Sequence, residues 1–228
     1  MAAFEELQQL KTELIRKALT GSVFVTDATS PDIGALTQVT GVAPDEVHDL
    51  VALPTGWEES DLGYTADSGA AFNTETTTSD VSSWQSVSPT RSDTTAETTT
   101  LQVVAQETKG LTIALYTGAL LSGIQAAATT GDLIVKKPQR PAARFYKVLS
   151  LARDEDEFGE IFIGRYLPRA KVTGRGGQAY DKSDNPIGYD VTFTGFYDST
   201  YGTAEAYIFG GAGWLARLAD MGISQAAA

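Results

Sequence analysis

Few residues of this chain are suited to acid-base or metal chemistry at neutral pH. The 228 residues include a single histidine, His48, and no cysteine. His48 lies beside Asp45, Glu46 and Asp49, and three carboxylates around an imidazole are a possible set of metal ligands. These residues share one short stretch with the spacing of a solvated helix surface, and we favour that interpretation. We therefore predict no catalytic, metal-binding or cofactor-binding residues and no enzymatic activity.

Other patterns that resemble catalytic motifs lack the features that the chemistry needs. A Ser-His-Asp triad would have to use His48, and the chain has no G-x-S-x-G elbow to present the serine. The glycine-rich stretches 174–177 and 210–213 match neither a Walker A motif nor G-x-G-x-x-G, so we expect turns there. The clustered carboxylates at 58–59 and 154–157 are expected to face water, the second group at a hairpin tip.

The charge of the chain is unevenly distributed. The net charge is −12, and residues 21–100 contain thirteen acidic residues and one basic residue, whereas the remainder contains sixteen of each. An acidic surface cannot replace the counterions of phosphates, so specific nucleic-acid binding is disfavoured, although DNA could still pass nearby. The one basic cluster consists of Lys136, Lys137, Arg140 and Arg144. We expect it to contact the acidic segment of a neighbouring copy.

The N-terminal segment, residues 1–20, is predicted to form a helix or arm. Its charged and apolar residues are interleaved, unlike those of a signal peptide, and no apolar run in the chain is long enough to span a membrane. Near-helical spacing relates Phe4, Leu7, Leu10, Leu14, Ile15 and Ala18. The apolar stripe of such a helix would either cap its own domain or dock on a neighbouring subunit. Residues 223–228 are expected to form a flexible tail.

Residues 21–222 are predicted to form one β-rich domain with long loops at about 21–55 and 120–142. Sixteen of the 28 residues at 73–100 are Ser or Thr. Because threonine is β-branched, we expect strands with a hydroxyl-rich face there and not a linker.

Further elements follow from periodicity and turn residues. Strands are predicted at 145–151, 161–167, 189–197 and 204–209, and the third of these has the clearest alternation of apolar and polar residues. A short helix is predicted near 111–118, capped by Glu107 or Thr108. Residues 181–188 have the composition of a hairpin turn.

Two regions together resemble the major tail tube proteins of long non-contractile-tailed bacteriophages, the siphophages, especially those that infect actinobacteria. In the first region, residues 56–91, Trp57 precedes Leu62-Gly-Tyr64, and a Trp84-Gln85 step precedes Pro89-Thr-Arg91. The second region runs from residue 167 to residue 193 and resembles the penultimate hairpin of that family. The chain departs from the family pattern at Asp67-Ser-Gly69, where a tighter turn is usual, and in having no immunoglobulin-like domain after Tyr197.

The resemblance implies a fold of two packed β-sheets, as a sandwich or barrel, flanked by a helix. Six copies would close a ring, and rings would stack into the tail tube, bridged by terminal arms and a long loop. It further implies a virion tail protein that is assembled in the host cytoplasm. Its partners would be copies of itself, the tape measure protein, the tail terminator and baseplate proteins. DNA would pass through the lumen without specific binding, and no membrane would be involved.

The polar strands fit such a lumen. DNA carries about one charge per 1.7 Å of axis, so hydroxyls and scattered carboxylates would let it slide where lysine or arginine would hold it. The lumen-facing candidates are Glu75, Asp80, Glu97, Thr98 and Thr100.

Other functions remain open at the level of the sequence. A secreted or surface adhesin, or a carbohydrate-binding β-sandwich, would also suit a threonine-rich acidic chain. A hydrolase centred on His48 ranks last. The inner tube of an injection device and a tail terminator would share the tail-tube fold.

Overall fold

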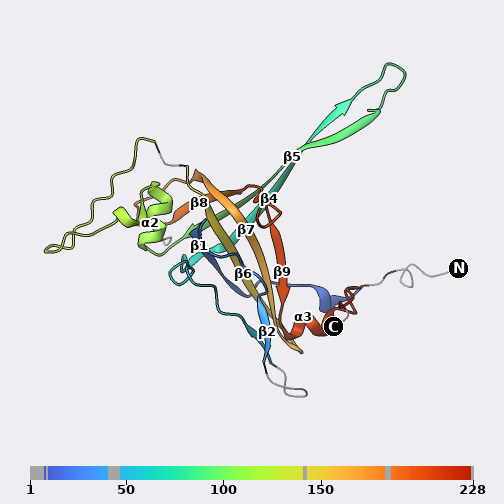
Figure 1. Cartoon of the computed structure of the whole chain (residues 1–228), viewed down its shortest axis with the longest axis horizontal. Helices are drawn as coiled ribbons and strands as arrows, with labels where there is room; N and C mark the ends of the chain where they lie inside the picture. Colours follow the sequence, from blue (N-terminus) through green and yellow to red (C-terminus); the bar gives the residue numbers. More distant parts are fainter. Residues whose placement is uncertain (1–7, 9, 41–46, 141–142, 183–185, 227–228) are drawn as a thin grey trace.

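The computed structural model of the chain describes residues 8, 10–40, 47–140, 143–182 and 186–226. Its main element is a seven-stranded antiparallel sheet with the order β1-β6-β7-β8-β5-β4, in which β9 also pairs with β7 (Figure 1). The strands are β1 (Thr20–Asp27), β4 (Thr65–Val81), β5 (Arg91–Ala105), β6 (Tyr146–Asp156), β7 (Gly159–Arg175), β8 (Tyr189–Gly195) and β9 (Ala206–Gly210). The predicted strands at 145–151, 161–167, 189–197 and 204–209 are thus confirmed.

A second, two-stranded sheet pairs β2 (Thr37–Thr40) with β3 (Val47–Leu50). Two α-helices, α2 (Gly110–Thr117) and α3 (Ala212–Arg217), and two 3-10 helices, η1 (Thr12–Leu14) and η2 (Leu121–Gly123), complete the described elements. The predicted fold class is confirmed: the protein is mainly β, with a large antiparallel sheet, a small second sheet and a short helix, consistent with a β-sandwich.

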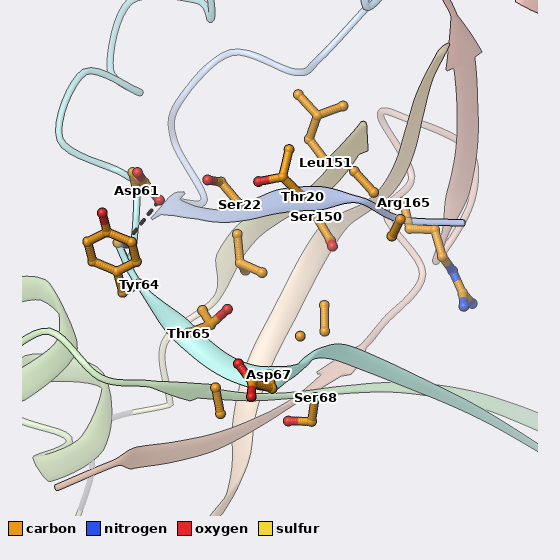
Figure 2. Close-up of a pocket in the computed structure, with 18 of the residues that line it drawn as sticks. Thr20, Ser22, Asp61, Tyr64, Thr65, Asp67, Ser68, Ser150, Leu151 and Arg165 are labelled. Carbon is orange, nitrogen blue, oxygen red and sulfur yellow. Dashed lines mark hydrogen bonds between the residues drawn. The ribbon is translucent and has the colours of Figure 1, made fainter. Parts of the chain in front are cut away.

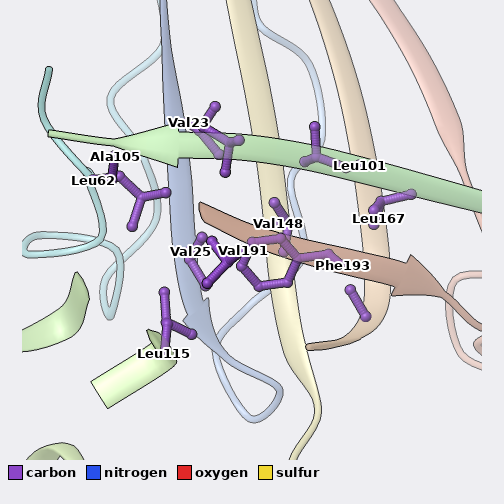
Figure 3. Close-up of a cluster of buried hydrophobic side chains, with 12 residues drawn as sticks. Val23, Val25, Leu62, Leu101, Ala105, Leu115, Val148, Leu167, Val191 and Phe193 are labelled. Atoms are coloured by element: carbon purple, nitrogen blue, oxygen red, sulfur yellow. The ribbon is translucent and has the colours of Figure 1, made fainter. Parts of the chain in front are cut away.

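The main core lies on one face of the large sheet, where the strands cross one another (Figure 3). Leu62 is fully buried there and packs among side chains from β1, β5, β6, β7 and β8. Leu115 covers the cluster from α2. The period-two pattern of β8 is explained by this packing, because Val191 and Phe193 point into the core while Thr192 points away from it.

A second core lies on the opposite face of β6 and β7. Adjacent residues of β6 point to opposite faces, so Val148 packs in the first core and Leu149 in the second. Trp57 is buried in the second core and donates its indole Nε1–H to the carbonyl of Pro31, at 3.0 Å. The residues from 28 to 36 are therefore packed against the sheet, although no helix or strand forms there.

A partly buried ion pair fixes this segment to the sheet. The Lys147 side chain is 8% exposed and that of Asp32 is 29% exposed. The Lys147 ammonium lies 2.6 Å from a carboxylate oxygen of Asp32, and the hydroxyl of Tyr166 donates to the same oxygen at 2.7 Å. Burial, and next the hydrogen bond to Asp32, raise the pKa of Tyr166, so its hydroxyl stays a donor. Asp32 thus neutralises a lysine that would otherwise be buried without a partner.

Replacing Asp32 by alanine should destabilise the domain by roughly 3 kcal/mol, because the Lys147 charge and the Tyr166 hydroxyl would lose their acceptor. Urea unfolding of dilute protein measures this loss. The matched control is Asp67→Ala, which removes an exposed carboxylate and should change stability little. Equal losses in the two variants would contradict a structural role for this ion pair.

The helix predicted near 111–118 is confirmed as α2, but its predicted cap is wrong. The N-cap residue is Lys109, and no side chain caps the helix. The Glu107 carboxylate instead accepts the backbone N–H of Tyr64 at 2.7 Å, and this bond, followed by the neighbouring Lys109, lowers the pKa of Glu107. Glu107 therefore ties the start of β4 to the end of β5.

The predicted N-terminal helix is not seen in the described part of residues 1–20. There η1 is a single 3-10 turn, and strand β1 begins at Thr20; Phe4 and Leu7 lie outside the described residues. Polar contacts hold this segment to its own domain, including a 2.9 Å ion pair between Lys11 and Asp220. Leu10 and Ile15 point to solvent, each more than 70% exposed.

Two smaller expectations also need correction. His48 and Asp49 lie on strand β3 and not on a helix, so successive side chains point to opposite faces; Asp45 and Glu46 lie outside the described residues. Gly174 lies within β7 and not in a turn, where its lack of a side chain allows close approach of Thr192. In the second glycine-rich stretch, Gly210 ends β9 and Gly213 lies within α3. The carboxylates at 154–157 lie at the β6–β7 hairpin, as expected, but not all of them face water: Asp154 is buried and accepts the backbone N–H of Lys17, and Asp156 pairs with Arg16 and Arg217.

Candidate assembly site: a projecting hairpin and its anchor

The β4–β5 hairpin extends far beyond the rest of the sheet (Figure 1). Strand β8 pairs only with the last six residues of β5, Thr100–Ala105, whereas β4 continues to pair with β5 out to Val81 and Arg91. The part of the hairpin that runs from Thr100 toward the tip is a two-stranded ribbon with side chains exposed on both faces. At about 3.3 Å per residue, it projects on the order of 30 Å. The strands predicted at 73–100 are confirmed, but their hydroxyls cover both faces.

Four of the five lumen candidates lie on this ribbon and Thr100 lies at its base; they do not share one face. Residues that pair directly across an antiparallel ladder point to the same side. Glu75 opposes Thr98, and Thr100 lies two residues further along the same face. Glu97 opposes Thr76 and so points to the other side, as does Asp80 by the alternation along β4.

The face that bears Glu75 continues onto the body of the sheet. We call it the outer polar face. It contains a ladder of hydrogen-bonded polar side chains: the Gln102 amide donates to the Asp190 carboxylate at 3.0 Å, and the Thr173 and Thr194 hydroxyls are 2.7 Å apart. Its members from β4, β5, β7 and β8 are Asn73, Glu75, Thr98, Thr100, Gln102, Lys171, Thr173, Asp190, Thr192 and Thr194.

The opposite face of the ribbon continues the core side of the sheet. Phe72 and Leu101 pair across the ladder at the base of the ribbon and pack in the main core. Beyond them the same side carries Thr76, Asp80 and Glu97, all exposed. Both faces of the ribbon are thus polar. One continues the outer polar face of the sheet, and the other continues the core side.

One arginine anchors the ribbon at its base. The Arg165 guanidinium of β7 lies between two rings, 3.8 Å from the centre of Phe72 and 4.6 Å from that of Tyr207. It also forms an ion pair with Glu205, whose carboxylate accepts the Thr99 hydroxyl at 2.9 Å. Both strands of the ribbon are therefore tied to the body through Arg165 and Glu205.

The large sheet leaves a gap between β1 and β4, the strands at the two ends of its main order (Figure 2). They are bridged at one end, where the Leu62 N–H donates to the Val23 carbonyl at 3.0 Å. Further along, β4 bulges between Thr65 and Ala70, and a cavity of about 880 Å³ opens between the strands. Both edges therefore present backbone groups available for further pairing.

The predicted basic cluster is split between two places. Lys136, Lys137 and Arg140 are exposed on the long loop that follows η2. Arg144 is half-buried at the base of that loop, where it donates to the Ala119 carbonyl at 3.3 Å. Within the described residues, no three His, Asp or Glu side chains are grouped closely enough to hold a metal ion.

A family comparison bears on the functions that the sequence left open. A family model described as phage tail tube protein matches residues 9–207, most of the chain. The chain belongs to the phage tail tube protein family. No curated protein matches it. None of the helices in the described part of the tail tube protein has the length and hydropathy needed to cross a bilayer.

Family membership makes this tail tube protein a structural component of the phage tail and implies self-assembly and association with other tail proteins. The motif residues that carried the resemblance have structural roles here. Trp57 and Leu62 are buried in the two cores, whereas Trp84 is almost fully exposed at the hairpin tip. The segment Asp67-Ser-Gly69, which departs from the family pattern, lies in the β4 bulge, where Gly69 has a φ of +61°.

Replacing Arg165 by alanine should loosen the ribbon of the tail tube protein while leaving the core folded. The loss of two ring contacts and an ion pair should cost roughly 1–2 kcal/mol. Hydrogen exchange of the amides at 73–81 and 91–99 should speed up, measured by mass spectrometry of peptides.

Arg165→Lys should give an intermediate result, because lysine keeps the charge but not the planar group between the rings. The control is Arg153→Ala, which removes a more exposed arginine paired with Glu155 and Glu160. Unchanged exchange in Arg165→Ala would show that the ribbon does not depend on this anchor.

Proposed function

We propose that six copies of this chain close a ring, that rings stack into the tail tube, and that its lumen conducts DNA during ejection. The supporting observation is the ribbon beyond Thr100, which pairs with nothing but itself. A two-stranded ribbon with both edges unpaired is marginally stable in water. Pairing with the ribbons of neighbouring copies would satisfy both edges and close a barrel.

The exposed apolar side chains support self-association. Leu10, Ile15, Trp84, Val87 and Ile134 are each more than 75% exposed. Trp84 and Val87 lie at the tip of the projecting β4–β5 hairpin and Ile134 on the projecting long loop (Figure 1), whereas Leu10 and Ile15 lie on the N-terminal segment beside the body. Large apolar side chains on projecting segments are typical of protein contacts.

In this proposal the outer polar face lines the lumen. It carries five threonines and is nearly neutral, because Glu75 and Asp190 are offset only by Lys171. Such a surface offers DNA no cluster of cations to bind. Of the five lumen candidates, Glu75, Thr98 and Thr100 belong to this face, and Asp80 and Glu97 belong to the opposite face.

We further propose that the tape measure protein, the tail terminator and baseplate proteins are the partners of the tube, and that assembly takes place in the host cytoplasm. The protein would act without a cofactor and without catalysis. The family match favours these tail proteins over the glycans that an adhesin would bind.

Electron microscopy of the purified protein over a concentration series tests self-assembly. We expect hollow tubes with six-fold end views, and a mass in solution that rises with concentration. A chain that stays monomeric throughout, even when tails sheared from virions are added as seeds, would contradict the proposal.

A shortened hairpin tests the ribbon itself. Replacing residues 78–95 by Asn-Gly keeps the paired base and supplies a two-residue turn. The variant should unfold cooperatively like the parent yet remain monomeric under conditions in which the parent forms tubes. Tubes of normal diameter from this variant would show that the ribbon does not build the wall.

Lysine substitutions distinguish the two faces of the ribbon. Glu75→Lys should slow DNA ejection from intact virions several-fold, because six new cations per ring would attract the DNA backbone. The matched control is Glu97→Lys, the same chemical change on the opposite face, which should leave ejection unchanged. Slower ejection only in Glu97→Lys would reverse the assignment of the lumen face.

A further inference from the structure

Two sets of charged side chains lack ion-pair partners among the described residues. One set is basic, Lys136, Lys137 and Arg140, on the long loop; the other is acidic, Asp27, Glu58 and Glu59, beside a groove. None of the six takes part in the salt bridges that the structure shows. All six are exposed. Their signs are complementary.

The groove lies between β1, the turn at 56–60 and helix α2. Its volume is about 480 Å³, within the range of about 300–1,000 Å³ that is usual for ligand pockets. Its lining combines apolar side chains with all three members of the acidic set and with Arg144. The apolar lining residues are Val25, Leu111, Ala114, Leu115 and Leu121.

The long loop combines the matching features within a few residues. Leu133, Ile134 and Val135 are followed directly by Lys136 and Lys137. Ile134 is 81% exposed. Backbone hydrogen bonds close a turn at the tip, from Ala127 N–H to the Asp132 carbonyl at 2.8 Å, so the apolar and basic residues lie on the returning arm of the loop.

The loop extends away from the body, on the side opposite to the β4–β5 hairpin (Figure 1). Its base lies at the groove, since Leu121 and Arg144 are among the lining residues. The exposed segment therefore points away from the groove of its own chain (Figure 1).

We propose that residues 133–137 of one copy dock in the groove of a second copy. Leu133 and Ile134 would contact the apolar lining residues, and Lys136 and Lys137 would pair with Glu58 and Glu59. The contact joins two different surfaces of the same chain, so it propagates from copy to copy, as a closed ring or a stack requires. This inference rests on the proposed self-assembly and names one of its contacts.

Because the chain has no cysteine, introduced cysteines report the contact directly. Ile134→Cys places a thiol on the loop, and Leu121→Cys places one at the lip of the groove. Tubes formed from an equal mixture of the two single variants should give covalent dimers on oxidation, since a disulfide needs Cα atoms about 4.4–6.8 Å apart. Thr129→Cys, at the loop tip, replaces Ile134→Cys in the matched control and should give no dimer with Leu121→Cys.

Each outcome of the cross-linking decides one point. Tubes without dimers would overturn the docking site and leave the proposed tube intact. Internal cross-links in the Ile134→Cys, Leu121→Cys double variant, without dimers in the mixture, would show that the loop folds onto its own groove and would also overturn the proposal. Absence of tubes from the wild-type chain would refute the proposed function itself.

Charge exchange tests the ion pairs. Lys136→Glu with Lys137→Glu should raise the concentration needed for assembly by at least about tenfold, because like charges would then meet in the contact. Glu58→Lys with Glu59→Lys should do the same, and the four changes in one chain should restore most of the assembly. Asp80→Lys with Glu97→Lys makes the same charge change away from the groove and should not rescue the loop variant. Failure of the four-fold exchange to improve on either pair would overturn the pairing.

Discussion

The unequal length of two paired strands determines most of the shape of this protein. Strand β5 has 15 residues, but β8 has only seven and pairs with six of them. The remaining part of β5 has no partner on that edge, so it leaves the body with β4 as a two-stranded ribbon. Main-chain N–H and C=O groups on both ribbon edges are then left to water or to another chain, and this is the strongest physical reason to regard the protein as one unit of an assembly.

Contacts from the body of the sheet hold the base of that ribbon. The sheet has buried residues on both faces of β6 and β7, so side chains pack against its centre from both sides. Arg165 extends from β7 to the base of the ribbon and is held there by Phe72, Tyr207 and Glu205. A guanidinium suits this position because its planar group stacks on rings and pairs with a carboxylate at the same time.

The uneven charge of the chain also has a structural meaning. The acidic residues of the first half of the chain do not form a single surface: Asp32 is paired with a buried lysine, Glu75 and Glu97 lie on opposite faces of the ribbon, and Glu58 and Glu59 lie beside a groove. Glu58 and Glu59, together with Asp27, line a groove that also has apolar side chains. One segment of the sequence therefore supplies charges for internal stability, for the ribbon and for the lining of a groove.

The sequence by itself determined the β class, the four strands from residue 145 onward, helix α2 and the membership suggested by the tail tube resemblance. These signals are local, since the alternation of Val191 and Phe193 with Thr192 follows from the geometry of a single strand. The sequence did not determine the N-terminal structure, where helical spacing over Leu10 and Ile15 gave only a 3-10 turn, or the partner of Glu107. Nor did the sequence show that Glu75 and Glu97 lie on opposite faces of the ribbon. The face on which a side chain lies depends on the register between paired strands, and a shift of one residue reverses it. The Arg165 anchor and the Asp32 pair join residues far apart in the chain, so only the tertiary structure could decide them.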